Sequence, residues 1–388
     1  MAFWDEQGSG PINWKQNLII LWIGVFLACA SYTACIPFLP VYLLKELHVA
    51  PEQVNFWSGL VYAVAFLGAS VMAPYWGAWA DKVGQRKMAI RAGLGLAITY
   101  VLGGVVQSAP QLFLVRGITG LISGFVPASM ALVSSTLPEE KMGWGMGLMQ
   151  TAVASGSILG PLLGGYLSVW FGMRMSFFVG SASLFAATVL VIFRVRDLVG
   201  SEMCIRDRGM FFLVQTCIMA IQPLITLYVG QLLGETGADA VKASGWIFSL
   251  AGIAGIVAAP FWGQQGQKRG YSRILCLVLG CAGLTNLCQV FVSSIWQFAL
   301  IQFVYGLFLA GAIPNINSVL VEETPQKMRG KAFGLTTSAQ QFGGVIGPLV
   351  GGLLGDFMPT RFVLFSVGIV LLLASLYTAG TRLKSTNR

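Results

Sequence analysis

Long apolar runs dominate the hydrophobic pattern of this chain. Twelve of them exceed about 18 residues, the length that a helix needs to cross a bilayer. None alternates apolar and polar positions as the strands of a membrane barrel do. The pattern therefore predicts an all-α membrane protein, because helices satisfy their own backbone hydrogen bonds in lipid. The runs cover Asn17–Leu44, Val54–Ala80, Met88–Ser108, Gln111–Thr136, Gly143–Trp170, Met175–Phe193, Gly209–Leu233, Ala243–Gln264, Ile274–Val292, Ile295–Leu320, Gly330–Phe357 and Arg361–Ala379.

The pattern occurs twice along the chain. The segment GSILGPLLGG at Gly156–Gly165 returns 187 positions later as GGVIGPLVGG at Gly343–Gly352. Likewise, APYWGAWADKVG at Ala73–Gly84 returns 186 positions later as APFWGQQGQKRG at Ala259–Gly270. A period this long indicates a duplicated half-molecule rather than a solenoid.

The repeat divides the twelve runs into two sets of six. We predict two pseudo-symmetric six-helix bundles at residues 1–193 and 209–388, joined by a cytoplasmic linker at 194–208. Ten residues of this linker, VGSEMCIRDR at 199–208, resemble a translated sequencing adapter, which is an artefact of sequencing. We therefore read no function from the charges of the linker.

Composition agrees with this prediction and accounts for the basic net charge. The chain is 56% hydrophobic and 10% charged, and its mean hydropathy is +0.74. The net charge is +9, but nineteen of the 24 Lys and Arg residues fall in the termini and in alternate loops. This bias predicts that both termini lie in the cytoplasm. The partner of the basic residues is then the lipid bilayer, and we expect no nucleic acid.

Reactive side chains are too few for a catalytic or metal site. The chain has seven Cys and one His, no Cys pair has CxxC spacing, and His48 has no His or Cys near it in the sequence. We therefore expect no metal, no cofactor and no catalytic residues, and we do not expect an enzyme.

The loop between the second and third runs carries a motif with a family likeness. It reads GAWADKVGQRK from Gly77 to Lys87, and it resembles the G-x-x-x-D-[RK]-x-G-[RK]-[RK] signature of the major facilitator superfamily. Glycine permits close helix approach and tight reversal, and an aspartate at the end of a span is able to meet a helix N-terminus. The resemblance implies a conformational latch with the aspartate facing the eleventh span; its residues are Gly77, Asp81, Lys82, Gly84 and Arg86. The alternative is a positive-inside loop with a turn glycine.

Two departures from the signature affect this interpretation. Gln85 stands where the family has a basic residue, and Gln267 stands in the second copy where Asp81 stands in the first. Any latch is therefore asymmetric between the halves.

The fifth run has glycine at every fourth position. Such a stripe lets another helix pack closely, and a proline inside a helix removes a hydrogen bond and permits a kink. Helix packing alone accounts for the spacing. In the superfamily, however, this motif marks drug exporters of the antiporter type, so the resemblance implies an exporter; the residues are Gly156, Gly160, Pro161, Gly164 and Gly165.

The fourth run contains a charge. Arg116 in LFLVRGITGLISG resembles the superfamily arginine that relatives use in proton coupling. An intramembrane charge is a functional candidate by default. Arg116 lies near the outer end of its run, so the alternative is that its side chain extends to the membrane surface. No Asp or Glu lies deep in any run, so the sequence offers no obvious proton carrier.

Uncharged polar residues occur inside several runs, mixed with aromatic residues and methionine. In relatives these spans line a central cavity, and a pocket of this composition suits amphipathic drugs better than sugars. Hydrogen bonding between helices is the alternative for each residue. The cavity candidates are Tyr32, Gln150, Gln222, Asn315, Asn317, Gln340 and Gln341.

Taken over nearly its whole length, the chain resembles the twelve-helix drug:proton antiporters of the major facilitator superfamily. Segments such as PINWKQNLI at 11–19 and IPFLPVYL at 36–43 carry the likeness to bacterial multidrug exporters. The resemblance implies a monomer in the bacterial inner membrane that exports small-molecule drugs against protons by alternating access. The alternatives are an importer of a neutral metabolite and a membrane sensor that transports nothing.

Overall fold

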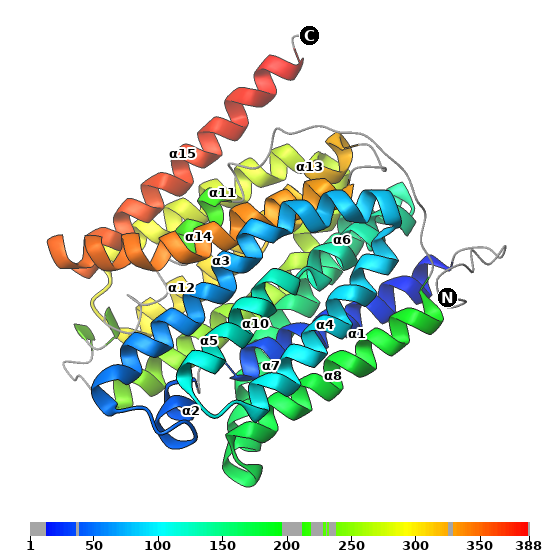
Figure 1. Ribbon diagram of the computed structural model, residues 1–388. Coiled ribbons are helices and arrows are strands. Elements are labelled where there is room, and N and C mark those ends of the chain that lie inside the picture. Colours follow the sequence, from blue (N-terminus) through cyan, green and yellow to red (C-terminus); the bar gives the residue numbers. More distant parts are fainter. Residues whose placement is uncertain are drawn as a thin grey trace. The chain divides into compact units, whose positions relative to one another are not determined.

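The computed structural model describes residues 13–35, 39–195, 212–218, 228–229, 231–232, 238–324 and 329–386. Every regular element within these ranges is helical (Figure 1), which confirms the predicted all-α class. Nine helical segments of the described part are long and apolar enough to cross a membrane. This number is consistent with the twelve predicted spans, of which the seventh, at 209–233, lies mostly outside the described residues.

The helices of the first half follow the predicted spans closely. They are α1 (Trp14–Cys35), α2 (Leu39–Lys45), α3 (Pro51–Val83), α4 (Gln85–Val105), α5 (Ala109–Ile122), α6 (Phe125–Thr136), the 3-10 turn η2 (Glu139–Lys141), α7 (Met142–Phe171) and α8 (Met173–Arg194).

In the second half, residues 212–218 are helical. The elements after them are α10 (Ala238–Arg269), α11 (Tyr271–Cys288), the 3-10 turn η3 (Gln289–Phe291), α12 (Ile295–Leu309), α13 (Ala312–Glu323), α14 (Arg329–Phe357) and α15 (Thr360–Thr386).

Two predicted spans are interrupted, where the apolar pattern indicated continuous helices. The first span contains α1 and α2, and residues 36–38 between them lie outside the described residues. The fourth divides into α5 and α6 because Gly124 has a φ of 137°, which is outside the helical region. The tenth divides into α12 and α13 at Ala310–Gly311. Hydrophobicity does not distinguish a broken apolar helix from a continuous one.

Backbone contacts divide the chain into two compact units that exchange two short segments. The first unit consists of Met1–Glu139, Ala152–Ile205 and Glu323–Ser338, and the second of Glu140–Thr151, Arg206–Glu322 and Ala339–Arg388. The boundaries fall inside α7 and α14. The first ten residues of α7 therefore belong to the second unit and the rest of α7 to the first. For α14 the assignment is reversed, with its first ten residues in the first unit.

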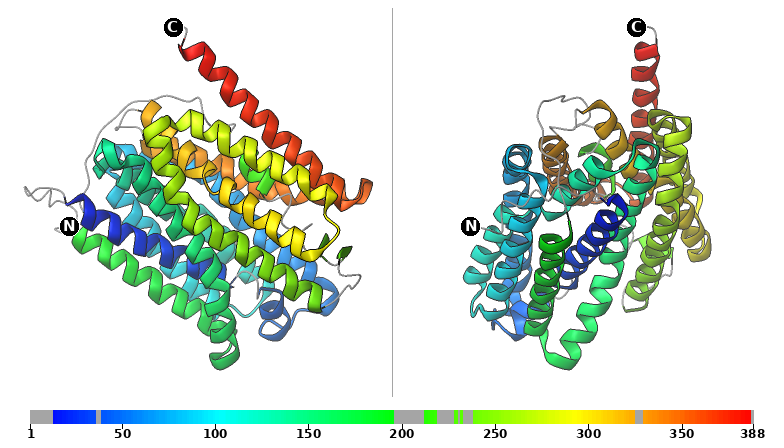
Figure 2. Two further views of the ribbon diagram at one scale, coloured as in Figure 1. Left: turned by 180° about the vertical axis from the view of Figure 1, so that it is seen from behind. Right: turned by 90° about the vertical axis from the view of Figure 1, so that its right-hand side faces the viewer.

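Within each unit, long helices pack along one another. In the first unit α4 and α1 both pack against α8, and α3 packs against α5. In the second unit α11 packs against α15, and α10 packs against α12 (Figure 2). Phe298, Leu279 and Leu371 are fully buried members of the apolar core of the second unit.

The duplication extends to individual hydrogen bonds. The indole of Trp76 donates to the carbonyl of Leu121 at 2.6 Å, and that of Trp262 donates to the carbonyl of Leu307 at 2.7 Å. Both residues of the second bond lie 186 positions after those of the first. The tyrosine hydroxyls repeat in the same way, since Tyr42 donates to the carbonyl of Gly103 and Tyr228 to that of Gln289.

The two tryptophans act at the interruptions of the fourth and tenth spans. A carbonyl in the last turn of a helix has no intrahelical partner, and lipid supplies none. The indole of Trp76 donates a hydrogen bond to the Leu121 carbonyl at the end of α5, and the indole of Trp262 donates one to the Leu307 carbonyl at the end of α12. Each interruption is therefore a stable element of the fold.

We predict that Trp76→Phe and Trp262→Phe each destabilise the protein by about 1 kcal/mol, because each leaves a carbonyl without its hydrogen bond. Thermal unfolding of the purified protein in detergent measures the effect. Trp296→Phe is the control, since Trp296 is 83% exposed. Melting temperatures of the two variants that equal that of the control would show that the indole bonds contribute nothing.

Candidate functional site

The turn between α3 and α4 has the geometry that its glycine predicts. Gly84 ends α3 and precedes α4 with a φ of 102°, and its N–H donates to the carbonyl of Ala80 at 2.8 Å. Gly270 joins α10 to α11 with a φ of 93°. Both positions need a residue that tolerates the left-handed region, so glycine is required in both copies of the motif.

Asp81 lies near the end of α3 and contacts the start of α14. One carboxylate oxygen accepts the backbone N–H of Lys331 at 2.7 Å, and the other accepts the side-chain amide of Gln85 at 3.0 Å. Lys331 is the third residue of α14, so its N–H has no intrahelical acceptor. The carboxylate also faces the positive end of the helix dipole. Gln85, the departure from the family signature, is a hydrogen-bond donor to Asp81.

Three further contacts hold the first ten residues of α14 within the first unit. The Arg329 guanidinium donates to the carbonyl of Ser134 on α6, and the Ser338 hydroxyl donates to the carbonyl of Ser70 at 2.5 Å. A Cβ on Gly334 would lie 3.0 Å from the Cα of Gly77. Gly77 and Gly334 therefore form a close backbone contact between α3 and α14. Burial lowers the pKa of Arg329, and the nearby Glu139 carboxylate opposes this effect.

The two basic residues of the motif have different surroundings. Arg86, the second residue of α4, donates to the carbonyl of Ile192 in the last turn of α8 at 2.5 Å. A cation at this place is favourable, because helix C-termini carry unpaired carbonyls and partial negative charge. Lys82 is exposed.

The second copy repeats the close backbone contact without the carboxylate. A Cβ on Gly147 in α7 would lie 2.7 Å from the carbonyl oxygen of Ala259 in α10, and Gly143 lies directly against Gly263. Tyr271, the counterpart of Gln85, packs its ring on Gly143. The first turn of α7 thus meets a neutral phenol where the first turn of α14 meets an anion.

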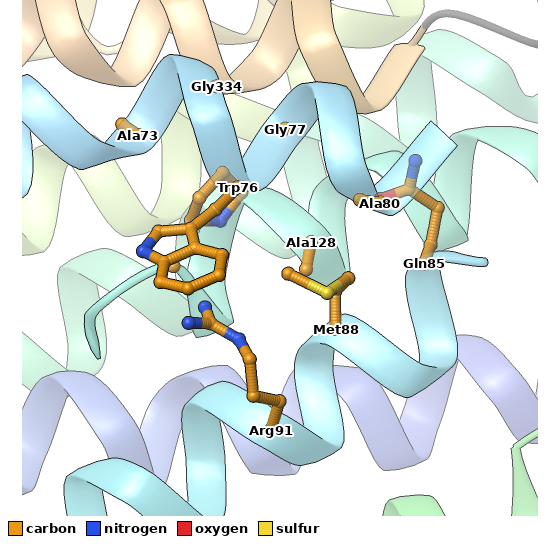
Figure 3. Close-up of a pocket in the computed structure, with 11 residues that line it drawn as sticks. Ala73, Trp76, Gly77, Ala80, Gln85, Met88, Arg91, Ala128 and Gly334 are labelled. Atoms are coloured by element: carbon orange, nitrogen blue, oxygen red, sulfur yellow. The ribbon is translucent and has the colours of Figure 1, made fainter. Parts of the chain in front are cut away.

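A small cavity lies near the turn at Gly84, between α3, α4, α6 and α14 (Figure 3). Its volume is about 20 Å³, enough for one water molecule and far too small for a drug-sized ligand. The Arg91 guanidinium lies 3.6 Å from the ring centroid of Trp76, which also lines the cavity, and donates to the carbonyl of Ser123 at 3.4 Å. Arg91 therefore supports the interruption between α5 and α6, although the sequence suggested only a loop charge.

The glycine stripe of α7 packs closely against α1. A Cβ on Gly156 would lie 2.7 Å from the carbonyl oxygen of Phe26, and one on Gly160 would lie 2.6 Å from that of Ala30. Gly164 lies against the carbonyl of Ala34 in the same way. Thr33 adds a hydrogen bond from its hydroxyl to the Gly156 carbonyl at 3.0 Å. The stripe is thus a close helix contact, and α7 continues through Pro161.

Arg116 is buried among aromatic rings, with 4% of its surface exposed. Its guanidinium lies 6.0 Å from the ring centroid of Tyr32 and 5.9 Å from that of Phe177, and it interacts electrostatically with Tyr100. One of the two interpretations of the sequence required the side chain to extend to the membrane surface. The burial of Arg116 shows that it does not. Tyr32 and Arg116, predicted separately, lie together.

The remaining cavity candidates have varied surroundings. Asn315 is fully buried, and its amide donates to the carbonyls of Trp262 and Gly311 at the interruption between α12 and α13. Gln340 donates to Gln215 at 3.3 Å. Asn317 is buried, Gln150 and Gln341 are half-buried, and Gln222 lies outside the described residues.

Sequence reasoning missed Trp76, Arg91 and Tyr100. The sequence did carry a signal for the first, since APYWG and APFWG repeat a tryptophan as well as the glycine that we used. The repeat gave no such signal for Arg91 and Tyr100, because Leu277 and Asn286 stand at the equivalent positions of the second half.

We predict that Gly164→Ala destabilises the purified protein by about 1–3 kcal/mol, because the added methyl group would overlap the backbone of α1. Gly59→Ala is the matched control, since nothing lies within 4 Å of a Cβ at that exposed helical position. Thermal unfolding in detergent compares the two. Equal melting temperatures would mean that the stripe is not a close contact.

Comparisons with known proteins agree with this geometry. The family model described as Major Facilitator Superfamily matches residues 21–202 and 209–386. Multidrug resistance protein MdtG of Dickeya zeae is 31% identical, over 98% of this chain and 98% of its own length. The proteins of that name from Enterobacter lignolyticus and Salmonella typhimurium are each 33% identical, over 97% and 95% of this chain and 94% and 96% of their own lengths.

A solved structure shows the same fold. The crystal structure of the human organic anion transporter MFSD10 (TETRAN) matches with a TM-score of 0.81 at 16% identity, and the match covers 95% of this chain and 100% of that chain. The family model covers most of the chain, and the relatives cover nearly all of it. The chain therefore belongs to the major facilitator superfamily of membrane transporters.

Proposed function

We propose that this protein is a secondary active multidrug exporter of hydrophobic or amphipathic compounds. The observation that carries the proposal is the full-length likeness to proteins named multidrug resistance protein MdtG. The glycine stripe of α7 supports it through its sequence, because the stripe resembles the motif that marks drug exporters of the antiporter type in the superfamily. The seven substrate-binding candidates are all uncharged, and the six that the structure describes are half-buried or buried, which suits amphipathic molecules.

Alternating access is the transport mechanism that we propose. The duplicated sequence supports it, since membrane transporters with internal repeats move one repeat against the other. In this mechanism the bond from Asp81 to the Lys331 N–H forms and breaks once in each cycle. A hydrogen bond to a charged group contributes about 1.5–3 kcal/mol, enough to change the ratio of two conformations by about 10- to 150-fold.

Proton coupling is part of the proposal, with Arg116 as an electrostatic participant. A guanidinium stays protonated in proteins, so Arg116 does not carry the proton itself. Its charge would favour proton release from a group nearby. Among the acids at span ends, Glu46 pairs with Arg174 at 3.1 Å, and Asp81 bonds to α14.

We further propose that the protein acts as a monomer in the bacterial inner membrane with both termini in the cytoplasm. The basic loops and termini support this orientation. The proposed partners are a small-molecule drug, protons and the lipid bilayer.

We predict that cells producing the protein accumulate less of at least one amphipathic antibiotic or dye than cells with an empty vector. A protonophore should abolish the difference, because it removes the gradient that drives export. Drug accumulation over a panel of compounds, with and without the protonophore, measures both effects. Equal accumulation across the panel would exclude the exporter, and a difference that survives the protonophore would exclude proton coupling.

We predict that Asp81→Asn lowers the initial export rate about tenfold at unchanged protein abundance, because the negative charge at the start of α14 is lost. Asp81→Glu keeps the charge and should retain more of the rate. The control is Glu52→Gln, which removes an exposed carboxylate from the other end of α3. If Asp81→Asn exports as fast as this control, Asp81 is not part of a latch.

A further inference from the structure

Two polar side chains of α4 have buried atoms without a hydrogen-bond partner in the part of the chain that the structure describes. They are the carbonyl oxygen Oε1 of Gln85 and the guanidinium nitrogen Nε of Arg91. Gln85 is 7% exposed, so bulk water does not solvate its amide. Buried polar atoms in folded proteins are almost always paired, either with the protein or with ordered water.

The two unpaired atoms have opposite hydrogen-bonding roles. The amide nitrogen of Gln85 donates to the carboxylate of Asp81 at 3.0 Å. Reversing the amide would place its oxygen against a negatively charged oxygen, so this bond fixes Oε1 as the atom without a partner. Oε1 is an acceptor. Nε of Arg91 is a donor, because a guanidinium nitrogen has no lone pair to offer.

Both side chains line the same cavity, which lies between α3, α4, α6 and α14. Figure 3 shows the side chain of Met88 between those of Gln85 and Arg91, because the three residues follow at intervals of three along α4. The rest of the lining is apolar apart from Trp76, whose indole already bonds a carbonyl. The cavity, of about 20 Å³, thus has room for one water molecule and offers it one acceptor and one donor.

We propose that this cavity is the binding site of one ordered water molecule, which bridges Gln85 and Arg91. The water donates a hydrogen bond to Oε1 of Gln85 and accepts one from Nε of Arg91. A chloride ion would accept from Arg91 but has no hydrogen to give to Gln85. A metal cation or ammonium ion would be repelled by the guanidinium. Water is the ligand of this size that serves both atoms.

The water connects two groups of direct contacts. On one side Gln85 bonds Asp81, which accepts the backbone N–H of Lys331 at the start of α14. On the other side Arg91 donates to the carbonyl of Ser123 at the interruption between α5 and α6. With the water in place, one chain of hydrogen bonds runs from the start of α14 to the break in the fourth span. This site is independent of the proposed export function, because its occupancy is measurable without transport.

Radiolytic labelling tests the site on the full-length protein in nanodiscs. A short X-ray pulse converts water to hydroxyl radicals, which oxidise the sulfur of a methionine beside it. Met88 lines the cavity and is 5% exposed, whereas Met130 is 4% exposed and does not line it. We expect Met88 to be oxidised roughly fivefold faster than Met130, as measured by mass spectrometry of the peptides. Equal rates would overturn the proposal, and this comparison needs no variant to fold.

Ala128→Val is the second measurement, because its larger side chain fills the cavity and leaves both polar groups in place. We expect it to slow the oxidation of Met88 to the rate of Met130, with the rate of Met130 unchanged. An unchanged Met88 rate in the variant would overturn the proposal, since the radicals would then come from bulk water. Faster oxidation of Met88 after gluconate replaces chloride in the buffer would also overturn it, because an anion would then occupy the cavity.

Discussion

The structure depends on one constraint: a backbone polar group in lipid must find its partner inside the protein. Within a continuous helix the backbone groups pair with one another. Where a helix is interrupted, side chains must supply the missing hydrogen bonds. The indoles of Trp76 and Trp262 each bond a carbonyl at the end of a broken span, and Arg91 and Asn315 bond further carbonyls there. At the start of α14, outside the apolar run, Asp81 likewise accepts a backbone N–H that has no helical acceptor.

The two halves share geometry but differ in charge. The tryptophan bonds, the turn glycines and the close backbone contacts all recur at an offset of 186 or 187 residues. At the start of α14 the contact is the carboxylate of Asp81, whereas at the start of α7 it is the ring of Tyr271, the counterpart of Gln85. Inside the units, Arg116 corresponds to Gln302. Duplicated packing gives both halves one fold, whereas neither Asp81 nor Arg116 has a charged counterpart in the second half.

Sequence alone predicted the helical class, the span positions and the turn at Gly84, because hydrophobic length and glycine spacing act locally. It did not predict that the fourth span is interrupted, since an apolar pattern is the same on both sides of Gly124. It identified Arg116 as a candidate but left two interpretations open, because its burial depends on rings from three other helices. Tyr32, Tyr100 and Phe177 lie on separate spans, so only the tertiary structure shows them around the guanidinium.

The carboxylate of Asp81 bonds the first turn of α14, whose first ten residues belong to the first unit. Amide hydrogen exchange over residues 329–338 measures how far this bond holds the segment, with residues 142–151 of α7 as an internal reference in the same sample. We expect Asp81→Ala to speed exchange in the α14 segment and to leave the α7 segment unchanged. Equal exchange of the α14 segment in the variant and in the unmodified protein would show that Asp81 does not hold it.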